Sequence, residues 1–193
     1  MRIGVLGSGG MAEALGGKWV AAGHEVVIGG RGRQRDLADR IGARAGTVDE
    51  ARAFGDVLLT AVPADVALEV LGDATGKVVV DCTNSVAPGF VLDEPEQARR
   101  LARSGGDVVK AFNLCHVDVW RTPEPVFQGR PLGVPLCGDS PEALHVVARL
   151  VRDAGCAPVL AGGLDRAALL EAAAAFVIKL WVEDQDVRSL FPG

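Results

Sequence analysis

Short apolar runs rich in β-branched residues alternate along the chain with longer segments in which apolar residues recur at helical spacing. The short runs lie at residues 2–6, 25–28, 56–62, 77–81, 107–111, 133–137 and 157–160. Their centres are continuously apolar, as expected of strands that helices cover on both faces. Strands separated by helices favour βαβ units. The pattern therefore predicts an α/β fold with a doubly wound parallel sheet.

Residue types at the segment ends support the helix assignments. Thr47 and Glu50 form a capping box, and Ser140 followed by Pro141 is a cap with proline in the first turn. The segment 112–130 contains prolines and has no clean period, so it is predicted to be a loop. Helices are predicted at 11–22, 47–54, from Pro63 onward, at 96–103, 141–153 and 165–182.

A glycine-rich turn joins the first strand to the first helix. Its sequence is Gly7-Ser8-Gly9-Gly10-Met11-Ala12, a G-x-G-x-x-A motif. Gly7 suits the tight turn, Gly9 lets a pyrophosphate approach the backbone, and Ala12 lets helix and strand pack closely. The N–H groups and dipole at the helix start then favour phosphate. Because a strand precedes the motif and a helix follows it, the sequence predicts a dinucleotide-binding site.

The residues after the second strand indicate which dinucleotide is bound. An NAD site would place an acidic residue there to accept from the ribose 2′-hydroxyl, and none occurs at 29–31. Arg31, Arg33 and Arg35 follow instead. Guanidinium pairs bidentately with phosphate, so we predict NADP(H), with Arg31 as the first candidate and Arg33 as the second. Arg35 could simply face solvent on the next helix, and the whole run could be a solvated charged face.

In doubly wound folds, ligands bind beyond the carboxyl ends of the strands. The segments that follow the strands there are Ala61-Val62-Pro63, Cys82-Thr83-Asn84-Ser85 and Ala111-Phe112-Asn113 with Leu114-Cys115-His116. Asn84 and Asn113 could bind the cofactor or acceptor, or could stabilise their own turns. Phe112 could stack on a ring or belong to the core. His116 is a candidate catalytic acid, although a lone histidine in an apolar loop is more often structural.

Composition narrows the class of protein. The chain has 193 residues, a formal net charge of −5 and 49% hydrophobic residues. Such a chain can form a sizeable core, and its acidic balance gives no support to a nucleic-acid partner. The four cysteines contain no C-x-x-C pair, so no disulfide framework or metal site is expected. With no visible signal peptide or membrane-spanning run, we expect a cytoplasmic protein without a membrane partner.

No linker divides the sequence. We therefore expect residues 1–160 to form a Rossmann domain that binds NADP(H), and residues 161–193 to form a C-terminal helical tail of the same compact unit. The tail helix has apolar residues at helical spacing: Leu169, Leu170, Ala173, Phe176, Val177 and Leu180. Such a face is more often core than interface, but with Trp181 and Phe191 it could also form a homodimer contact.

Four stretches resemble a known family. The glycine turn with Gly23–Gly29 and a following arginine, the segments Val109–Asn113 and Leu136–Ala143, and the tail around Leu164–Glu171 are similar to NADPH-dependent coenzyme F-420 (deazaflavin) reductases. The two middle segments also resemble the cytoplasmic reductase domain of six-transmembrane ferric reductases. No membrane-spanning segment follows them here, so we do not expect a membrane ferric reductase.

The resemblance implies NADP(H) and hydride exchange with a deazaflavin or flavin ring, often in a homodimer. It places Arg31 at the 2′-phosphate, Val62 and Pro63 beside the adenosine, and Asn84 and Ala111–Asn113 near the nicotinamide. Residues assigned to the pyrophosphate are Gly7, Ser8, Gly9, Gly10, Met11 and Ala12. The family commonly has Ser or Thr where this chain has Gly30, and Arg33 could replace the lost contact. Residues 115–130 do not match closely.

Other functions remain open on the sequence. One alternative is reduction of a small imine, a carbonyl or a ferric chelate. Enzymes of the first two kinds generally need a large helical domain, whereas about one helix follows the last predicted strand here. Another is a non-catalytic module that senses NADP(H) or binds a partner. The fold alone does not decide among them, because function depends on the site.

Overall fold

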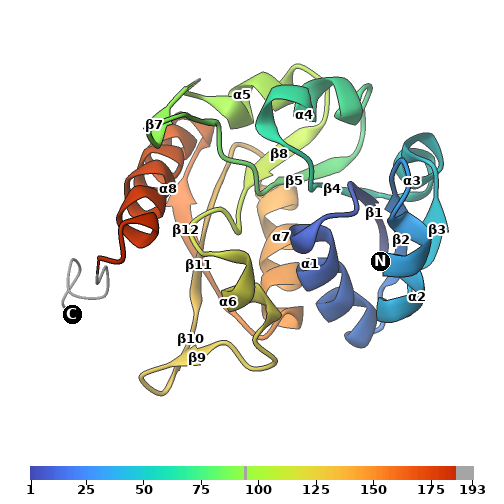
Figure 1. Ribbon diagram of the computed structural model, residues 1–193. Helices are drawn as coiled ribbons and strands as arrows, with labels where there is room; N and C mark the ends of the chain where they lie inside the picture. The colour runs from blue at the N-terminus through green and yellow to red at the C-terminus, as the bar shows by residue number, and fades with distance from the viewer. Residues whose placement is uncertain (94, 186–193) are drawn as a thin grey trace.

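The computed structural model describes residues 1–93 and 95–185, and these form a sheet with helices on both faces (Figure 1). The sheet has eight strands in the order β12-β11-β8-β5-β4-β1-β2-β3. Its strands are β1 Arg2–Leu6, β2 Glu25–Gly29, β3 Arg44–Gly46, β4 Val57–Thr60, β5 Val78–Asp81, β8 Asp107–Lys110, β11 Gly133–Gly138 and β12 Ala157–Gly162. The α/β doubly wound class predicted from the pattern is confirmed.

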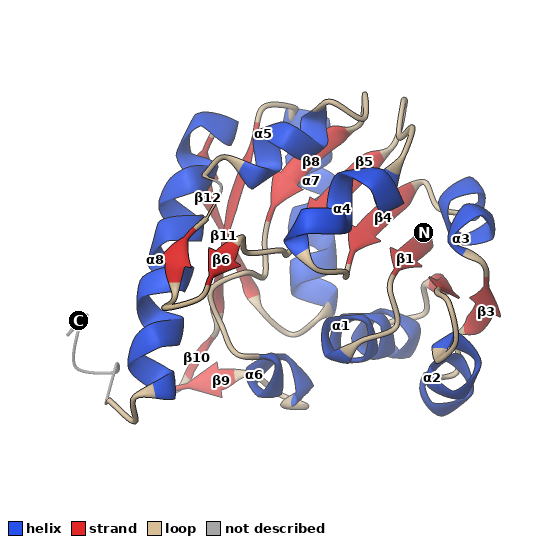
Figure 2. Ribbon diagram, turned by 45° about the horizontal axis from the view of Figure 1, so that its top comes forward, coloured by secondary structure: helices blue, strands red, loops and turns tan. Residues whose placement is uncertain are grey.

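Helices form a layer on each face of the sheet (Figure 2). One core cluster joins one face of the sheet to α1 Gly10–Ala21, α2 Gln34–Ile41 and α7 Pro141–Asp153. The other joins the opposite face to α3 Val48–Phe54, α4 Ala64–Leu71 and α5 Gln97–Ala102. The central strands are therefore covered on both faces, which explains why they lack polar alternation, whereas the edge strands β12 and β3 are partly exposed.

The parallel arrangement has one exception. Strand β11 runs antiparallel to β8, with Cys137 opposite Lys110, and parallel to β12. The prediction of a wholly parallel sheet is wrong at this pair. A parallel neighbour requires a long crossover, usually a helix lying on the sheet, and the chain after β8 forms no such helix. It therefore enters β11 from the opposite end of the sheet.

The segment after β8 is also more ordered than predicted. Instead of a loop over 112–130, the structure has α6 Val117–Arg121 and a hairpin of β9 Val126–Phe127 and β10 Arg130–Pro131. Trp120 anchors α6, because its side chain is buried and packs edge-on against Phe112, 5.4 Å between ring centroids. Five residues are too few to show a helical period, so the sequence pattern did not reveal this helix.

The predicted cap signals are confirmed. Thr47 accepts from the Glu50 N–H while the Glu50 carboxylate accepts from the Thr47 N–H, completing the capping box of α3. Ser140 caps α7 through its bond from the Ala143 N–H. Pro63 stands one residue earlier than predicted, at the cap of α4 rather than in its first turn. The pattern did not predict the short strands β3, β6 Val86–Ala87 and β7 Val91–Leu92.

The C-terminal part begins with the 3₁₀ turn η1 Leu164–Arg166 and continues as α8 Ala167–Val182. Helix α8 packs against α5 and β7. Its outer face is not core: Leu169 and Phe176 are 58% and 55% exposed. Phe191, the other aromatic residue of the predicted interface, lies outside the described residues. Within the described residues, no helix is both long and apolar enough to span a membrane.

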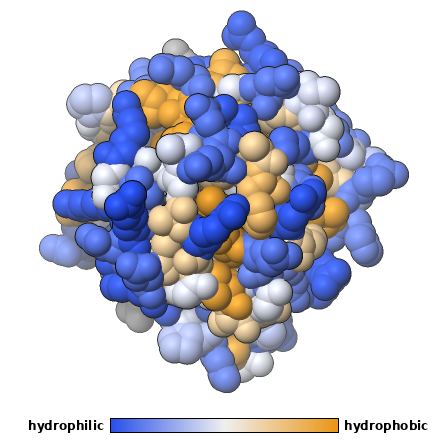
Figure 3. All heavy atoms as spheres, turned by 90° about the vertical axis from the view of Figure 1, so that its right-hand side faces the viewer, coloured by the Kyte–Doolittle hydropathy of each residue, from blue (hydrophilic) through white to orange (hydrophobic). Residues whose placement is uncertain are grey.

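The far edge of the sheet, at β3, lies on the side formed by α2 and α3 (Figure 1). Figure 3 shows this side of the molecule, where polar residues surround small groups of apolar ones. Scattered apolar atoms of this kind are normal on a soluble surface.

Candidate active site

The glycine turn has the geometry that its residue types predict. Gly7 has φ +125°, and a Cβ there would lie 2.1 Å from the Ala61 carbonyl oxygen. A Cβ on Gly9 would meet no atom within 4 Å, because this glycine faces open space at the start of α1. Ala12 is fully buried against the strand layer. The turn thus leaves its backbone open to a ligand, and a larger side chain at Gly9 would fill that space.

Three cavities adjoin this turn. The Arg31 cavity, about 440 Å³, is lined among others by Gly7, Ser8, Arg31, Arg33, Val62 and Pro63. The glycine-turn cavity, about 350 Å³, includes Ser8, Gly9, Gly10, Glu13, Arg33 and Arg121. The Trp181 cavity, about 460 Å³, includes Met11, Asn84, Phe112, Asn113, His116 and Trp181. The first two share Ser8 and Arg33, and the third begins at Met11. All three lie around the start of α1, where an extended dinucleotide would be able to contact each of them.

Arg31 and Arg33 are exposed at the first of these cavities, and in the described part of the chain neither takes part in an ion pair. Gln34 holds the intervening turn by accepting from the Gly32 N–H at 2.6 Å. Unpaired guanidinium groups at the end of β2 fit a phosphate. Arg35 is exposed on α2 and is absent from the lining of the Arg31 cavity.

The structure explains why this chain has Gly30 where the resembling family commonly has Ser or Thr. A Cβ at this position would lie 3.1 Å from Ser8 Oγ and 3.3 Å from Ser8 Cβ. A side chain at position 30 would therefore be in tight contact with Ser8 and Gln34, which a glycine avoids. The Ser8 hydroxyl lies in the same cavity as Arg31 and can offer a phosphate the contact that a Ser or Thr at position 30 would supply.

Three other candidate residues contribute differently. Ala61 places its main-chain oxygen against Gly7 and is absent from the lining of the three cavities, and so is the fully buried Ala111. Phe112 lines the Trp181 cavity but is only 2% exposed, and it packs edge-on between Trp19 and Trp120. It also has φ +61°, which is rare for a bulky residue. Strain of this kind is typical of functional turns.

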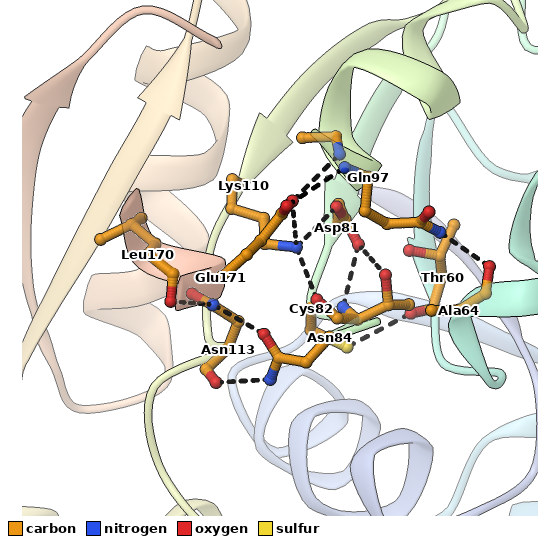
Figure 4. A network of polar contacts seen from close by, with 12 residues as sticks. Thr60, Ala64, Asp81, Cys82, Asn84, Gln97, Lys110, Asn113, Leu170 and Glu171 are labelled. Atoms are coloured by element: carbon orange, nitrogen blue, oxygen red, sulfur yellow. Dashed lines mark hydrogen bonds and ion pairs between the residues drawn. The ribbon is translucent and has the colours of Figure 1, made fainter. Parts of the chain in front are cut away.

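Asn84 and Asn113 bind each other across the Trp181 cavity wall (Figure 4). Asn84 Nδ2 donates to the Asn113 carbonyl at 2.8 Å, and Asn113 Nδ2 donates to Asn84 Oδ1 at 2.9 Å and to the Leu170 carbonyl at 3.1 Å. The pair joins the loops after β5 and β8 to α8. Among the described residues, Asn113 Oδ1 and one N–H of Asn84 are left without a partner and are free for a ligand.

Behind this pair lies a buried ionic network that sequence reasoning did not predict (Figure 4). Lys110 Nζ lies 3.0 Å from Asp81 Oδ2 and 3.1 Å from Glu171 Oε1, and it donates to the Thr83 carbonyl at 2.5 Å. The three charged side chains are fully buried. Burial lowers the pKa of Lys110, but the adjacent carboxylates of Asp81 and Glu171 outweigh it, and the net result is a raised pKa.

Glu171 also completes the start of α5. Its two carboxylate oxygens accept from the Gln97 and Ala98 N–H groups, at 3.1 and 3.2 Å. Helix α8 is thus tied to α5 and β8 through one glutamate, and through Lys110 to Asp81 on β5. Lys110 lies within the K-A-F-N segment, but no local pattern marks Glu171 as its partner, because the two are far apart in the sequence.

Comparisons with known proteins agree with this geometry. Residues 2–85 match the family model described as NADP oxidoreductase coenzyme F420-dependent. The metalloreductase STEAP3 of Rattus norvegicus is 30% identical over 187 residues, which cover 93% of this chain and 38% of the relative. The chain thus spans well under half of that protein. Both resemblances indicated by the motifs are confirmed.

Solved structures show the same fold. A protein described as an F420-dependent NADP reductase from Arthrobacter sp. FB24 has a TM-score of 0.79 and 20% identity, with 95% of this chain and 94% of that chain covered. An imine reductase from Aspergillus terreus in complex with NADPH4 has a TM-score of 0.65 and 16% identity, covering 95% of this chain and 60% of that chain.

Residues 2–85 thus resemble a family of NADP-dependent oxidoreductases, and the solved structures share the fold of the whole chain. The relative and the structural neighbours are described as reductases of different kinds, so they do not decide an acceptor. What distinguishes this chain must therefore be sought in its own Trp181 cavity.

That cavity offers little acid–base or thiol chemistry. Burial raises the pKa of the Cys82 thiol to about 12 and that of Cys115 to about 11. Neither forms an appreciable thiolate at neutral pH, so both serve as small packing residues, as the sequence suggested. The described residues contain no group of three or more His, Cys, Asp or Glu side chains that could hold a metal ion.

His116 stands at the mouth of the Trp181 cavity. Its Nδ1 accepts from the Asp118 N–H at 3.4 Å and so caps α6, and its ring lies edge-on to Trp181, with 6.2 Å between centroids. The side chain is 61% exposed. His116 therefore places an ionisable side chain beside this cavity, in reach of both solvent and a ligand.

Proposed function

We propose that this chain transfers a hydride between NADP(H) and a deazaflavin (coenzyme F-420) or flavin-type ring. The observation that carries the proposal is the Trp181 cavity. It adjoins the glycine turn, its walls are mainly apolar, and Phe112, Ile178 and Trp181 are among them. An apolar cavity with a few polar groups at one side suits a flat aromatic ring better than a small polar substrate.

The cofactor supplies the hydride chemistry when it is bound. The chain's own residues would position it: Gly7–Ala12 at the pyrophosphate, Arg31 and Arg33 at the 2′-phosphate, and Val62 with Pro63 beside the adenosine. Asn84 and Asn113 would orient the nicotinamide through the donor and acceptor left on their amides. The apolar walls would exclude water from the two rings.

Ring-to-ring hydride transfer also suits the shortage of catalytic groups. A hydride is a hydrogen nucleus that moves together with two electrons. No acid or base therefore has to act on the C–H bond that breaks. If the acceptor takes up a further proton, His116 at the cavity mouth is our candidate donor, with solvent as the competing source. An imine or carbonyl acceptor would depend far more on such a donor.

The test offers purified protein NADPH with coenzyme F-420, FMN, FAD and a ferric chelate in parallel, and follows absorbance at the nicotinamide and acceptor bands. We expect F-420 or a flavin to be reduced much faster than the chelate. Reduction of the chelate alone, or of none of the rings by a protein that binds NADPH, would refute the proposed acceptor class. The Gly9→Val variant is the matched control for turnover by contaminants.

We also propose that this chain forms a cytoplasmic homodimer that pairs through α8. Support comes from the apolar residues on its outer face, of which Leu169, Phe176 and Val182 are more than half exposed. Light scattering coupled to size exclusion tests the pairing, with Phe176→Glu expected to yield monomers. A monomeric wild-type protein at micromolar concentration would refute it.

A further inference from the structure

Helix α6 lies directly over the start of α1, where the glycine turn ends. Two contacts fix it there. Trp120 is buried in the core, and Lys18 Nζ on α1 donates to the Thr122 and Pro123 carbonyls at 2.8 and 3.1 Å, just past the end of α6. Arg121, the last residue of α6, is therefore held near the turn by the packing of its neighbours.

The guanidinium of Arg121 reaches the glycine turn itself. A Cβ on Gly10 would lie 3.2 Å from Arg121 Nη2 and 3.1 Å from Val117 Cγ2. Gly10 is not one of the motif's required glycines, and this close approach of α6 explains why a glycine fits there. The guanidinium also lines the glycine-turn cavity together with Ser8 and Gly9.

Two carboxylates orient the guanidinium. Arg121 Nη2 donates to Glu13 Oε2 at 3.0 Å, and Nη1 donates to Asp118 Oδ1 at 2.8 Å. Guanidinium has five N–H groups, so three are left for another acceptor. The other oxygen of Glu13 accepts from Arg40 at 2.9 Å. Glu13 is therefore neutralised from both sides, and its negative charge near the turn does not repel an incoming anion.

The charge state of this cluster is stable at neutral pH. Hydrogen bonds from Arg40 and Arg121 hold the pKa of Glu13 below its usual range, and bonds to Asp118 and Glu13 raise the pKa of Arg121. The cluster of Glu13, Asp118, Arg40 and Arg121 is formally neutral. A pyrophosphate bound at the glycine turn would bring two further negative charges beside Arg121.

We propose that Arg121 binds the pyrophosphate of NADP(H), opposite the backbone N–H groups of the glycine turn. Glu13 and Asp118 act as positioning residues that hold the guanidinium in place before the cofactor arrives. The inference rests on the proposed cofactor site and adds to it a cation from outside the G-x-G-x-x-A motif. The dinucleotide then passes the end of α6 where Arg121 lines the glycine-turn cavity, which places part of the poorly matching segment 115–130 beside the cofactor.

The experiment measures dissociation constants of NADPH, NADH and 2′-AMP for wild type, Arg121→Gln, Arg121→Lys and Arg99→Gln. Arg99 is the matched control, because it is an exposed arginine on α5 that also pairs with a glutamate, at 3.3 Å, and is absent from the lining of all three cavities. The nucleotide 2′-AMP carries the 2′-phosphate without the pyrophosphate.

For Arg121→Gln we expect NADPH and NADH to weaken by the same factor, about tenfold or more, since a charge-assisted hydrogen bond is lost. The dissociation constant of 2′-AMP should stay unchanged in Arg121→Gln. Arg121→Lys should bind NADPH more weakly than wild type but more tightly than Arg121→Gln. Arg99→Gln should bind all three ligands as wild type does. Unchanged NADPH affinity in Arg121→Gln would refute the inference and leave the cofactor site standing. An equal loss of 2′-AMP would refute it too, because it would show general damage. A wild-type protein that binds no NADPH would refute both proposals.

Discussion

The two halves of the candidate site are built in different ways. The half around the glycine turn takes most of its proposed phosphate-binding residues from one stretch of sequence, Gly7 to Arg33, with Arg121 added from α6, and its guanidinium groups are exposed. The half around the Trp181 cavity draws its walls from α1, the loops after β5 and β8, and α8. Behind it lies the fully buried network of Lys110, Asp81 and Glu171.

This contrast separates what the halves do. A short exposed segment can bind a phosphate with little effect on the fold, because its side chains make few other contacts. A cavity assembled from distant segments exists only while those segments are held together. We therefore expect changes in the first half to alter affinity, and changes behind the second half to alter stability.

The largest effect on binding is expected for Gly9→Val. A Cβ at Gly9 meets no protein atom within 4 Å, so the fold should tolerate valine, while its side chain fills the place of the pyrophosphate. We expect titration by nicotinamide fluorescence to show no binding of NADPH or NADH, with an unchanged urea midpoint. Wild-type affinity in this variant would exclude the glycine turn as the cofactor site.

The largest effect on stability is expected for Lys110→Met, which leaves Asp81 and Glu171 buried without their cation. Breaking a buried ion pair from one side costs about 3–5 kcal/mol. Urea unfolding checks this value, with Lys179→Met as the control, because Lys179 pairs with Glu183 on the surface of α8. Lys179→Met should lower the free energy of unfolding by about 1 kcal/mol or less. An equal loss of unfolding free energy in the two variants would show that the buried network contributes no more to stability than a surface ion pair.

An intermediate effect is expected for Arg31→Ala. NADPH should weaken by a factor of about ten to one hundred and fifty, from a lost charge-assisted bond of about 1.5–3 kcal/mol, and NADH should stay nearly unchanged. Competitive titration of both cofactors measures the ratio. If the affinities for NADPH and NADH fell alike, Arg31 would support the fold and would not bind the 2′-phosphate. The half around the glycine turn would then depend on structural residues, as the half around the Trp181 cavity does.

The smallest effect is expected for His116→Asn. Asparagine can still cap α6, and the exposed cavity mouth gives water access to the acceptor. We expect kcat to fall by less than the factor of about one hundred that removal of an essential general acid produces. A larger loss in single-turnover kinetics, with NADPH affinity intact, would make His116 an essential proton donor and favour an imine or carbonyl substrate.

Part of the site follows from particular residues without any structure. The order Gly7, Gly9, Ala12 after an apolar run specifies the turn, and Arg31 in place of an acid indicates NADP(H). Arg121 gave no such signal. It is one of 20 Lys and Arg residues, and only the packing of α6 on α1 brings its guanidinium to Gly10.

The sequence by itself therefore determined the α/β class, the cap residues of α3 and α7, and the glycine turn, since each depends on contacts within a few residues. Only the tertiary structure decided the antiparallel entry of β11, the helix α6, the joining of Lys110 to Glu171 and the walls of the Trp181 cavity. These features depend on which distant segments pack together. Bringing such segments together costs chain entropy, and the burial of apolar surface offsets that cost only once they are in contact.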